Sequence, residues 1–250
     1  MRGDTGFPVR LRFSKRGKIR FVSHRDVARA FERSLRIAGL PVAHTAGFSP
    51  RPKLSFGLAL GVGYESDAEY LDLELREPTD VGQLPDALGA GLPPGLDVRG
   101  AAPLAPRAPA LQESVTTVAY ELTPFGLGPD ALASAAAALL AATTLPVPTT
   151  RKAQPVVVDV RPSLHDLAVT PDGHRLAVEV STRPRPARPP ELFTALRTLA
   201  CVGVDDGEDR VLRTHQWIER DGARCEPLAA DRAPSAPAGA VTRAPAVLTS

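Results

Sequence analysis

The sequence predicts an α+β protein built from two tandem ferredoxin-like βαββαβ units with antiparallel sheets. Three observations support this prediction. Segments with apolar residues at every second position alternate with segments in which they recur every three to four positions. The order strand–helix–strand–strand–helix–strand occurs in the first half of the chain and again in the second. A proline-rich segment separates the two halves.

The first unit is expected over residues 8–102. In residues 9–13, apolar side chains alternate with two arginines, which predicts a half-buried strand. Ser23 is a candidate helix N-cap, with an acidic residue three positions later. Apolar residues then follow at helical spacing, at Val27, Phe31, Leu35 and Ala38. The remaining expected elements are a strand at 54–60, a strand at 70–75, a helix near 80–90 and a strand near 96–99.

The second unit is expected over residues 116–220, after a proline-rich linker at 103–115. Its expected strands lie at 118–122, 156–160, 174–180 and 210–218, with a further extended stretch around 164–169. Its expected helices lie at 129–142 and 190–199. Residues 226–250 are mostly Ala, Pro, Thr and Ser. They cannot bury enough apolar surface to offset the entropy of ordering, so we expect a disordered tail.

Composition excludes several classes of protein. No apolar run approaches the roughly 18 residues that a membrane-spanning helix needs, and the N-terminal residues lack the apolar stretch of a signal peptide. Cys201 and Cys225 are too few to bind an iron–sulfur cluster and form no CxxC pair. A P-loop, a GxGxxG fingerprint and an HExxH motif are missing. We therefore expect a cytoplasmic protein with no membrane contact, no metal and no cofactor.

Positive charge is concentrated at the start of the chain. Residues 1–60 hold 13 Lys/Arg and 3 Asp/Glu, whereas residues 61–100 hold 2 and 9. Residues 101–250 are close to balance, with 15 and 16. This asymmetry indicates a local surface that faces a polyanion. The alternative is that the two oppositely charged segments lie side by side and neutralise each other.

The first expected helix carries a stripe of arginines opposite its apolar residues. These are Arg25, Arg29, Arg33 and Arg36, which follow at intervals that keep them on one side. Such a stripe suits a phosphate backbone, because repeated phosphate contacts dominate nucleic-acid affinity. An ordinary solvated helix face is the alternative.

The segment Gly47-Phe-Ser-Pro-Arg-Pro-Lys53 is the most specific candidate site. Its two prolines fix φ and favour extended conformations at the residues before them. Arg51 and Lys53 are therefore expected to project to the same side and to bind a phosphate or carboxylate with little loss of freedom. Phe48 is expected to stack on a base. The alternatives are a merely rigid connection and a Phe48 that fills the core.

His24 stands at the start of the expected helix, where the helix dipole disfavours its protonation. A neutral imidazole there could act as a general base, although a structural hydrogen-bonding role is the alternative. Lys15 and Arg20 complete the candidate anion-binding set. Arg10 and Arg12 are expected to lie beside the face that carries Asp72, where cross-strand ion pairs compete with a binding role.

Five segments of the first half carry a resemblance to a known family. They are Arg12-Phe-Ser-Lys15, Arg20-Phe-Val-Ser-His-Arg-Asp26, Phe31-Glu-Arg33, Gly47-Phe-Ser-Pro-Arg-Pro-Lys-Leu-Ser-Phe56 and Glu69-Tyr-Leu-Asp72. The chain resembles the radical SAM-associated proteins of unknown function over residues 9–76, and more loosely over 151–215. The family commonly has leucine where this chain has Arg25. The resemblance implies an accessory role beside a radical SAM enzyme.

Two functions are consistent with these residues. The first is a binding module that presents RNA, or another phosphate-bearing ligand, to a radical SAM enzyme. The second is an RNA-processing or RNA-modifying enzyme that uses His24 as general base and Arg51 or Lys53 to stabilise developing charge. A third possibility is that the basic segment docks onto an acidic protein partner.

Overall fold

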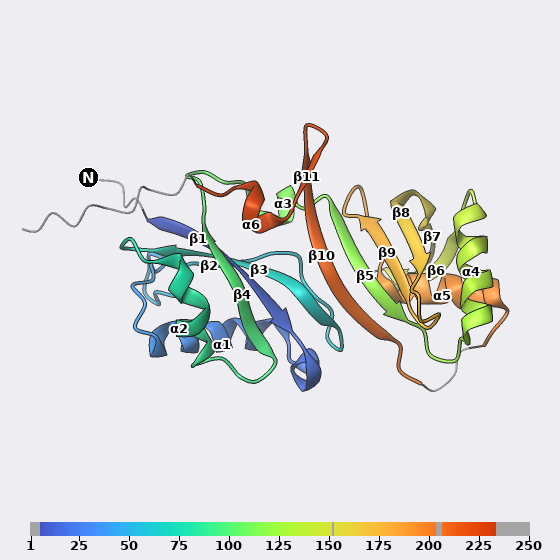
Figure 1. Cartoon of the computed structure of the whole chain (residues 1–250), viewed down its shortest axis with the longest axis horizontal. Coiled ribbons are helices and arrows are strands. Elements are labelled where there is room, and N and C mark those ends of the chain that lie inside the picture. Colours follow the sequence, from blue (N-terminus) through green and yellow to red (C-terminus); the bar gives the residue numbers. More distant parts are fainter. Residues whose placement is uncertain (1–5, 152, 204–206, 234–250) are drawn as a thin grey trace, which may run out of the picture.

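The computed structural model describes residues 6–151, 153–203 and 207–233 (Figure 1). Its first unit has the predicted βαββαβ order. Strand β1 lies between β3 and β4 and is antiparallel to both, and the short β2 pairs with β3. This arrangement confirms a ferredoxin-like unit. Its elements are β1 (Phe7–Lys15), η1 (Gly17–Phe21), α1 (His24–Ile37), β2 (Leu54–Phe56), β3 (Glu65–Leu75), η2 (Val81–Gln83), α2 (Leu84–Gly89) and β4 (Leu96–Pro103).

The second unit repeats the arrangement, with strand β5 between β9 and β10 and β8 on the far side of β9. Its helices α4 and α5 pack against each other and supply the apolar core with side chains from β5 and β9. The elements from the connection onward are α3 (Leu111–Ser114), β5 (Thr117–Thr123), α4 (Pro129–Ala141), β6 (Pro146–Arg151), β7 (Gln154–Asp159), η3 (Arg161–Ser163), β8 (Leu164–Val169), β9 (Leu176–Ser181), α5 (Pro189–Ala200) and β10 (Arg210–Arg220).

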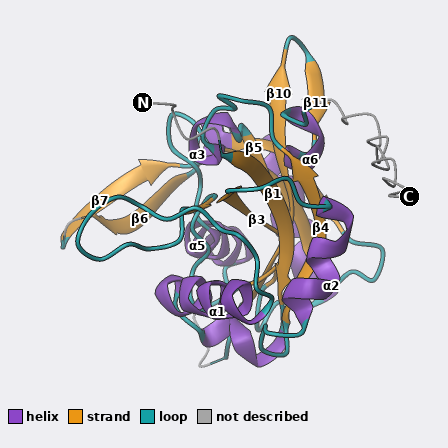
Figure 2. Cartoon of the chain, turned by 90° about the vertical axis from the view of Figure 1, so that its left-hand side faces the viewer, coloured by secondary structure: helices purple, strands orange, loops and turns teal. Residues whose placement is uncertain are grey.

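The prediction for the second strand of the second unit was wrong. We expected residues 156–160 to be the second strand of the unit. The structure places residues 156–159 in a separate two-stranded hairpin, β6–β7, which stands away from the main sheet (Figure 2). The extended stretch 164–169 is the sheet strand instead. Val157 is 70% exposed, because the hairpin lies outside the core. The run of valines correctly predicts a strand, but it does not indicate which sheet the strand joins.

Helix α1 forms where the sequence predicts it. The Ser23 hydroxyl accepts a hydrogen bond from the Asp26 backbone N–H at 3.3 Å and so caps the first turn. Val27, Phe31 and Leu35 are buried against the sheet. Gly39 follows the helix with φ +63, a left-handed conformation that glycine adopts without strain. The four arginines of the helix point away from this buried face, as their exposure shows.

The two units share one continuous sheet. Strand β3 of the first unit pairs in parallel with β10 of the second, through Glu65 opposite Leu212 and Ser66 opposite Arg213. Arg213 lies opposite Tyr120 on β5, on the side of the second unit's core. It also reaches Glu69, which shares the helix-covered side of β3. The helices of both units therefore cover the same face of the shared sheet.

The C-terminal segment covers the other face of the first unit. Strand β11 (Ala223–Cys225) pairs with β10, and α6 (Pro227–Ala230) packs on β1, β4 and β10. We expected disorder from residue 226 onward; this was wrong for residues 226–233, which the structure describes. The rest of the expected tail, residues 234–250, lies outside the described residues.

Arg10 explains why this segment is ordered. Its guanidinium is fully buried and donates to both carboxylate oxygens of Asp72, at 2.7 and 2.9 Å. It also donates to Asp231 at 3.3 Å and to the Pro227 carbonyl at 3.2 Å. The ion-pair interpretation of Arg10 is thus confirmed. Two of the groups that accept hydrogen bonds from Arg10, the Pro227 carbonyl and the Asp231 carboxylate, come from the segment that composition alone predicted to be disordered.

Replacing Tyr70 with phenylalanine should lower the free energy of unfolding by about 1–2 kcal/mol at pH 7, because a buried hydrogen bond to a carboxylate is lost. The Tyr70 hydroxyl donates to Glu226. Burial, together with this bond, raises the pKa of Tyr70 above its ordinary value of 10.0. In the unfolded chain the phenol ionises at about pH 10, so its stabilising effect is present below that pH and is lost above it. Urea unfolding from pH 7 to 11 should show a steeper alkaline decline for the wild type; equal slopes would contradict the assignment.

Among the described residues, no helix is both long enough and apolar enough to cross a membrane.

Candidate anion-binding site

The arginine stripe of α1 faces solvent. Arg25, Arg29, Arg33 and Arg36 are all exposed. Arg29 pairs with Asp26 at 3.0 Å, one turn away on the same helix. Within the described part of the chain, no carboxylate lies at ion-pair distance from the other three. Helix α1 therefore presents three guanidinium groups without a carboxylate partner along about 17 Å of its length.

The loop before β2 holds an aromatic and a cation in solvent. Phe48 is fully exposed, which excludes a role in the core. Arg51 is also exposed, and its backbone is fixed by Thr45, whose hydroxyl accepts from the Arg51 N–H at 3.1 Å and whose N–H donates to the Arg51 carbonyl at 2.8 Å. Lys53 differs, because its ammonium group pairs with Glu74 at 3.0 Å. Among the described contacts, Lys53 is therefore already paired, whereas the Arg51 guanidinium has no carboxylate partner and can bind a ligand.

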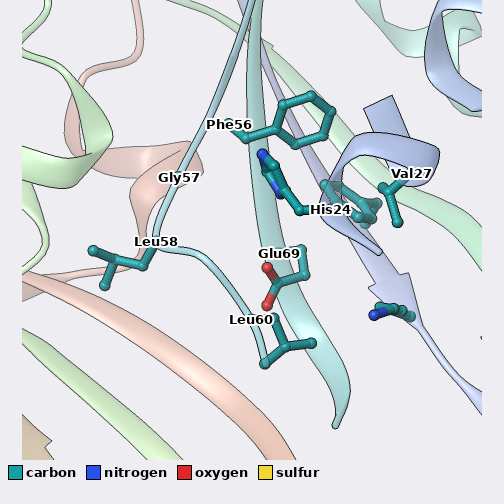
Figure 3. A pocket seen from close by; sticks show the side chains of 9 residues that line it. His24, Val27, Phe56, Gly57, Leu58, Leu60 and Glu69 are labelled. Atoms are coloured by element: carbon teal, nitrogen blue, oxygen red, sulfur yellow. The ribbon is translucent and has the colours of Figure 1, made fainter. Parts of the chain in front are cut away.

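His24 lines a small cavity at the N-terminus of α1. Its ring packs edge-on against Phe56, with centroids 4.9 Å apart, and Glu69 lies on the cavity wall (Figure 3). Lys15 also lines this cavity, but its ammonium group donates to the carbonyls of Arg20 and Val22 at 3.1 and 2.9 Å. Burial lowers the pKa of Lys15, and the nearby Glu69 carboxylate opposes that shift.

Arg20 and Lys15 are therefore not free surface cations. The Arg20 guanidinium lies 4.4 Å from the centre of the Phe21 ring and 3.5 Å from Glu208. Lys15 is buried and supports the turn around η1. Both residues organise the start of α1 in the structure.

The predicted residues do not all converge. Phe56 lies opposite Leu71 on the helix-covered side of the sheet and contacts His24. Lys53 is three residues earlier on the extended chain and pairs with Glu74 on the other side. Lys53 and His24 therefore lie on opposite faces of the first sheet. The structure brings together His24, Lys15 and Glu69, and leaves Lys53 apart from them.

A larger cleft lies between the two units on the helix-covered face. Its volume is about 630 Å³. The loop 58–64 forms the wall on the first unit. The other lining residues come from α3, β5, β9, β10, the segment before α5 and the first turn of α5. Leu58 lines both this cleft and the small cavity beside His24. The cleft is therefore next to the N-terminus of α1.

Arg213 forms part of the cleft floor. It is buried, and its guanidinium donates to Glu69 and to the Leu58 carbonyl, both at 2.9 Å. It also donates to the Ala59 carbonyl at 3.1 Å and to the Tyr120 hydroxyl at 3.3 Å. Its Nε–H has no partner among the described residues. Glu69 helps to keep the pKa of Arg213 above its ordinary value, although burial opposes the charge.

A protein-family match covers the first unit and most of the second. A family described as uncharacterized proteins conserved in bacteria, DUF2344, matches residues 9–189. The chain belongs to this family. No curated protein matches it. The family description names no radical SAM enzyme, so that association stays a prediction.

The DUF2344 match ends before β10, so Arg213 lies outside the matched range. Sequence reasoning had overlooked this residue in the DUF2344 chain, although one signal was present. In the strand 210–218, Val211 and Arg213 are two positions apart, so an inward Val211 implies an inward arginine. An arginine on a core-facing position is seldom left without polar partners. Three of the four partners, Leu58, Ala59 and Glu69, come from the first unit, which the pattern does not reveal.

Proposed function

We propose that this DUF2344 chain is a cytoplasmic accessory protein that binds RNA, or another phosphate-bearing ligand, and presents it to a radical SAM enzyme. The exposed arginines of α1 that lack a described carboxylate partner carry the proposal: Arg25, Arg33 and Arg36. Exposed Phe48 and Arg51 add a stacking surface and a further cation. The partner enzyme is proposed from the resemblance over residues 9–76.

The chemistry of these residues suits a single-stranded nucleic acid. Guanidinium groups bind phosphates and release counterions, which makes affinity fall as salt rises. An aromatic ring held in solvent stacks on bases of any sequence. The proposed module therefore favours RNA as a polyanion and reads little of its base sequence.

Removing three α1 cations should weaken RNA binding far more than removing three cations elsewhere. In the triple variant Arg25→Ala/Arg33→Ala/Arg36→Ala, the slope of log affinity against log salt should become shallower by about 2, at about 0.7 per lost phosphate contact. Affinity at low salt should fall at least about tenfold. Fluorescence anisotropy with a labelled single-stranded RNA measures both quantities.

The matched control is Arg99→Ala/Arg175→Ala/Arg210→Ala. It removes the same three charges, but each arginine is paired with a carboxylate in the structure: Asp97, Asp172 and Glu65 respectively. We expect it to bind RNA nearly as well as the wild type. If both variants bound RNA equally weakly, the loss would depend only on net charge and not on the position of the arginines. If the wild type did not bind RNA, the proposal would be wrong.

The second candidate function is RNA cleavage or modification with His24 as general base. The observation that favours it is the position of His24 on a cavity wall shared with the Glu69 carboxylate (Figure 3). Lys53 cannot stabilise charge there, because it lies on the other face of the sheet. Incubating labelled RNA with the wild type and with His24→Gln tests this function. Conversion that is lost in the variant would favour the enzyme, whereas binding without conversion favours the module.

A further inference from the structure

We propose that the cleft between the two units is a second binding site, separate from the α1 surface, for a mononucleotide unit: one phosphate joined to a planar ring system. Its volume of about 630 Å³ lies within the range of about 300–1,000 Å³ of small-molecule sites. The cleft combines cations, aromatic rings and apolar side chains from both units. The site goes beyond the proposed RNA surface and does not depend on it.

Two arginines of the cleft have no carboxylate at ion-pair distance in the described chain. Arg183 and Arg188 line the cleft and are exposed. No carboxylate is among the described residues that line the cleft, and within the described chain none lies at ion-pair distance from the guanidinium of either arginine. The Arg183 guanidinium donates to the Glu113 carbonyl, and Glu191 accepts from the backbone N–H of Arg188 at 2.9 Å, so both guanidinium charges stay without a counter-ion. Glu69 offsets the charge of Arg213, so the net positive charge comes from Arg183 and Arg188. An anionic group is the ligand that this electrostatic environment favours.

Arg213 adds an unpaired donor to the cleft lining. Four hydrogen bonds hold the Arg213 guanidinium in place, three to acceptors of the first unit and one to the Tyr120 hydroxyl. The Nε–H is left over, is buried and lies at a residue that lines the cleft. Buried donors are almost always paired in folded proteins. The cleft lining therefore has more donors than acceptors at this point, which favours a ligand that brings acceptors, such as a phosphate.

The rest of the cleft suits a planar ring. Tyr64 and Tyr120 line it, together with the apolar side chains of Leu58, Val118 and Val180. Burial raises the pKa of Tyr64 further above its ordinary value of 10.0, which favours the protonated hydroxyl that can both donate and accept a hydrogen bond. Aromatic rings in offset or edge-on contact bind planar heterocycles well. A purely inorganic anion would leave this apolar surface unused, which is why we favour a nucleotide.

Isothermal titration calorimetry with adenosine 5′-monophosphate tests the site, with inorganic phosphate and adenosine as separate probes. The nucleotide should bind saturably and at least tenfold more tightly than either probe. Arg183→Ala and Arg188→Ala should each weaken it at least fivefold, whereas Arg99→Ala, an exposed arginine outside the cleft, should not. Both cleft arginines are exposed, so these variants are expected to fold, and circular dichroism checks this.

The α1 triple variant separates this site from the RNA surface, because it should keep full affinity for adenosine 5′-monophosphate. In that variant, a short RNA with a 5′-phosphate that competes with the nucleotide would show that the cleft takes an RNA end; no competition would show that it takes free nucleotide. Either result supports the site. Absent saturable binding, or binding that Arg183→Ala and Arg188→Ala leave unchanged, would overturn it.

Discussion

Glu69→Gln should lower the free energy of unfolding by about 3 kcal/mol or more, because it leaves a buried arginine without its counter-ion. The Arg213 side chain is 4% exposed and that of Glu69 is 11% exposed. The two join β10 of the second unit to β3 of the first. Arg213 cannot lose its proton at any pH that the fold survives, so the uncompensated charge stays buried. Urea unfolding followed by circular dichroism measures the loss.

A control on the same pair of strands distinguishes burial from strand pairing. Glu65 is also on β3 and pairs with Arg210 on β10 at 3.5 Å, but the Arg210 side chain is 63% exposed. Glu65→Gln should therefore cost less than about 0.5 kcal/mol. The double variant Glu69→Leu/Arg213→Met replaces the buried pair by apolar side chains and should recover most of the stability. Similar losses in Glu69→Gln and Glu65→Gln would show that the buried pair has no special role.

The first unit could be predicted because its periodicities leave little choice. Val9, Leu11 and Phe13 define one face of a strand, and Val27 with Phe31 defines one face of a helix. Both faces are buried in the structure. The exposure of the α1 arginines follows from the same helical period. These features are local, so the sequence alone contains the information that determines them.

The features that were missed depend on contacts between distant segments. The choice between strands 156–160 and 164–169 depends on which of them reaches β9, and each segment is apolar enough to form a strand. Lys53 was expected to be a free cation, but the register of β2 on β3 brings it to Glu74. The cleft exists because β3 pairs with β10, about 145 residues later in the chain. No local pattern encodes that pairing.

A chain that ends at Cys225 should be less stable than one that ends at Ala233 by about 3 kcal/mol or more, because a buried ion pair loses a partner and a buried hydroxyl loses its acceptor. The longer chain keeps every contact described here. The shorter one lacks Asp231 and Pro227, which bind Arg10, and Glu226, which binds Tyr70 and lies 3.3 Å from Arg12. Thermal and urea unfolding of both chains give the difference.

Asp231→Asn in the full chain distinguishes the effect of the Asp231 charge from the effect of α6 packing on the sheet. It keeps α6 in place and removes one counter-ion of Arg10 and of Arg220. Asp72 still pairs with Arg10, so we expect a loss of about 1–2 kcal/mol, smaller than that of the truncation. If the chain ending at Cys225 were as stable as the chain ending at Ala233, the segment would not be needed to neutralise Arg10. The composition-based expectation of disorder from residue 226 would then hold, because contacts that add no stability cannot offset the entropy of ordering the segment.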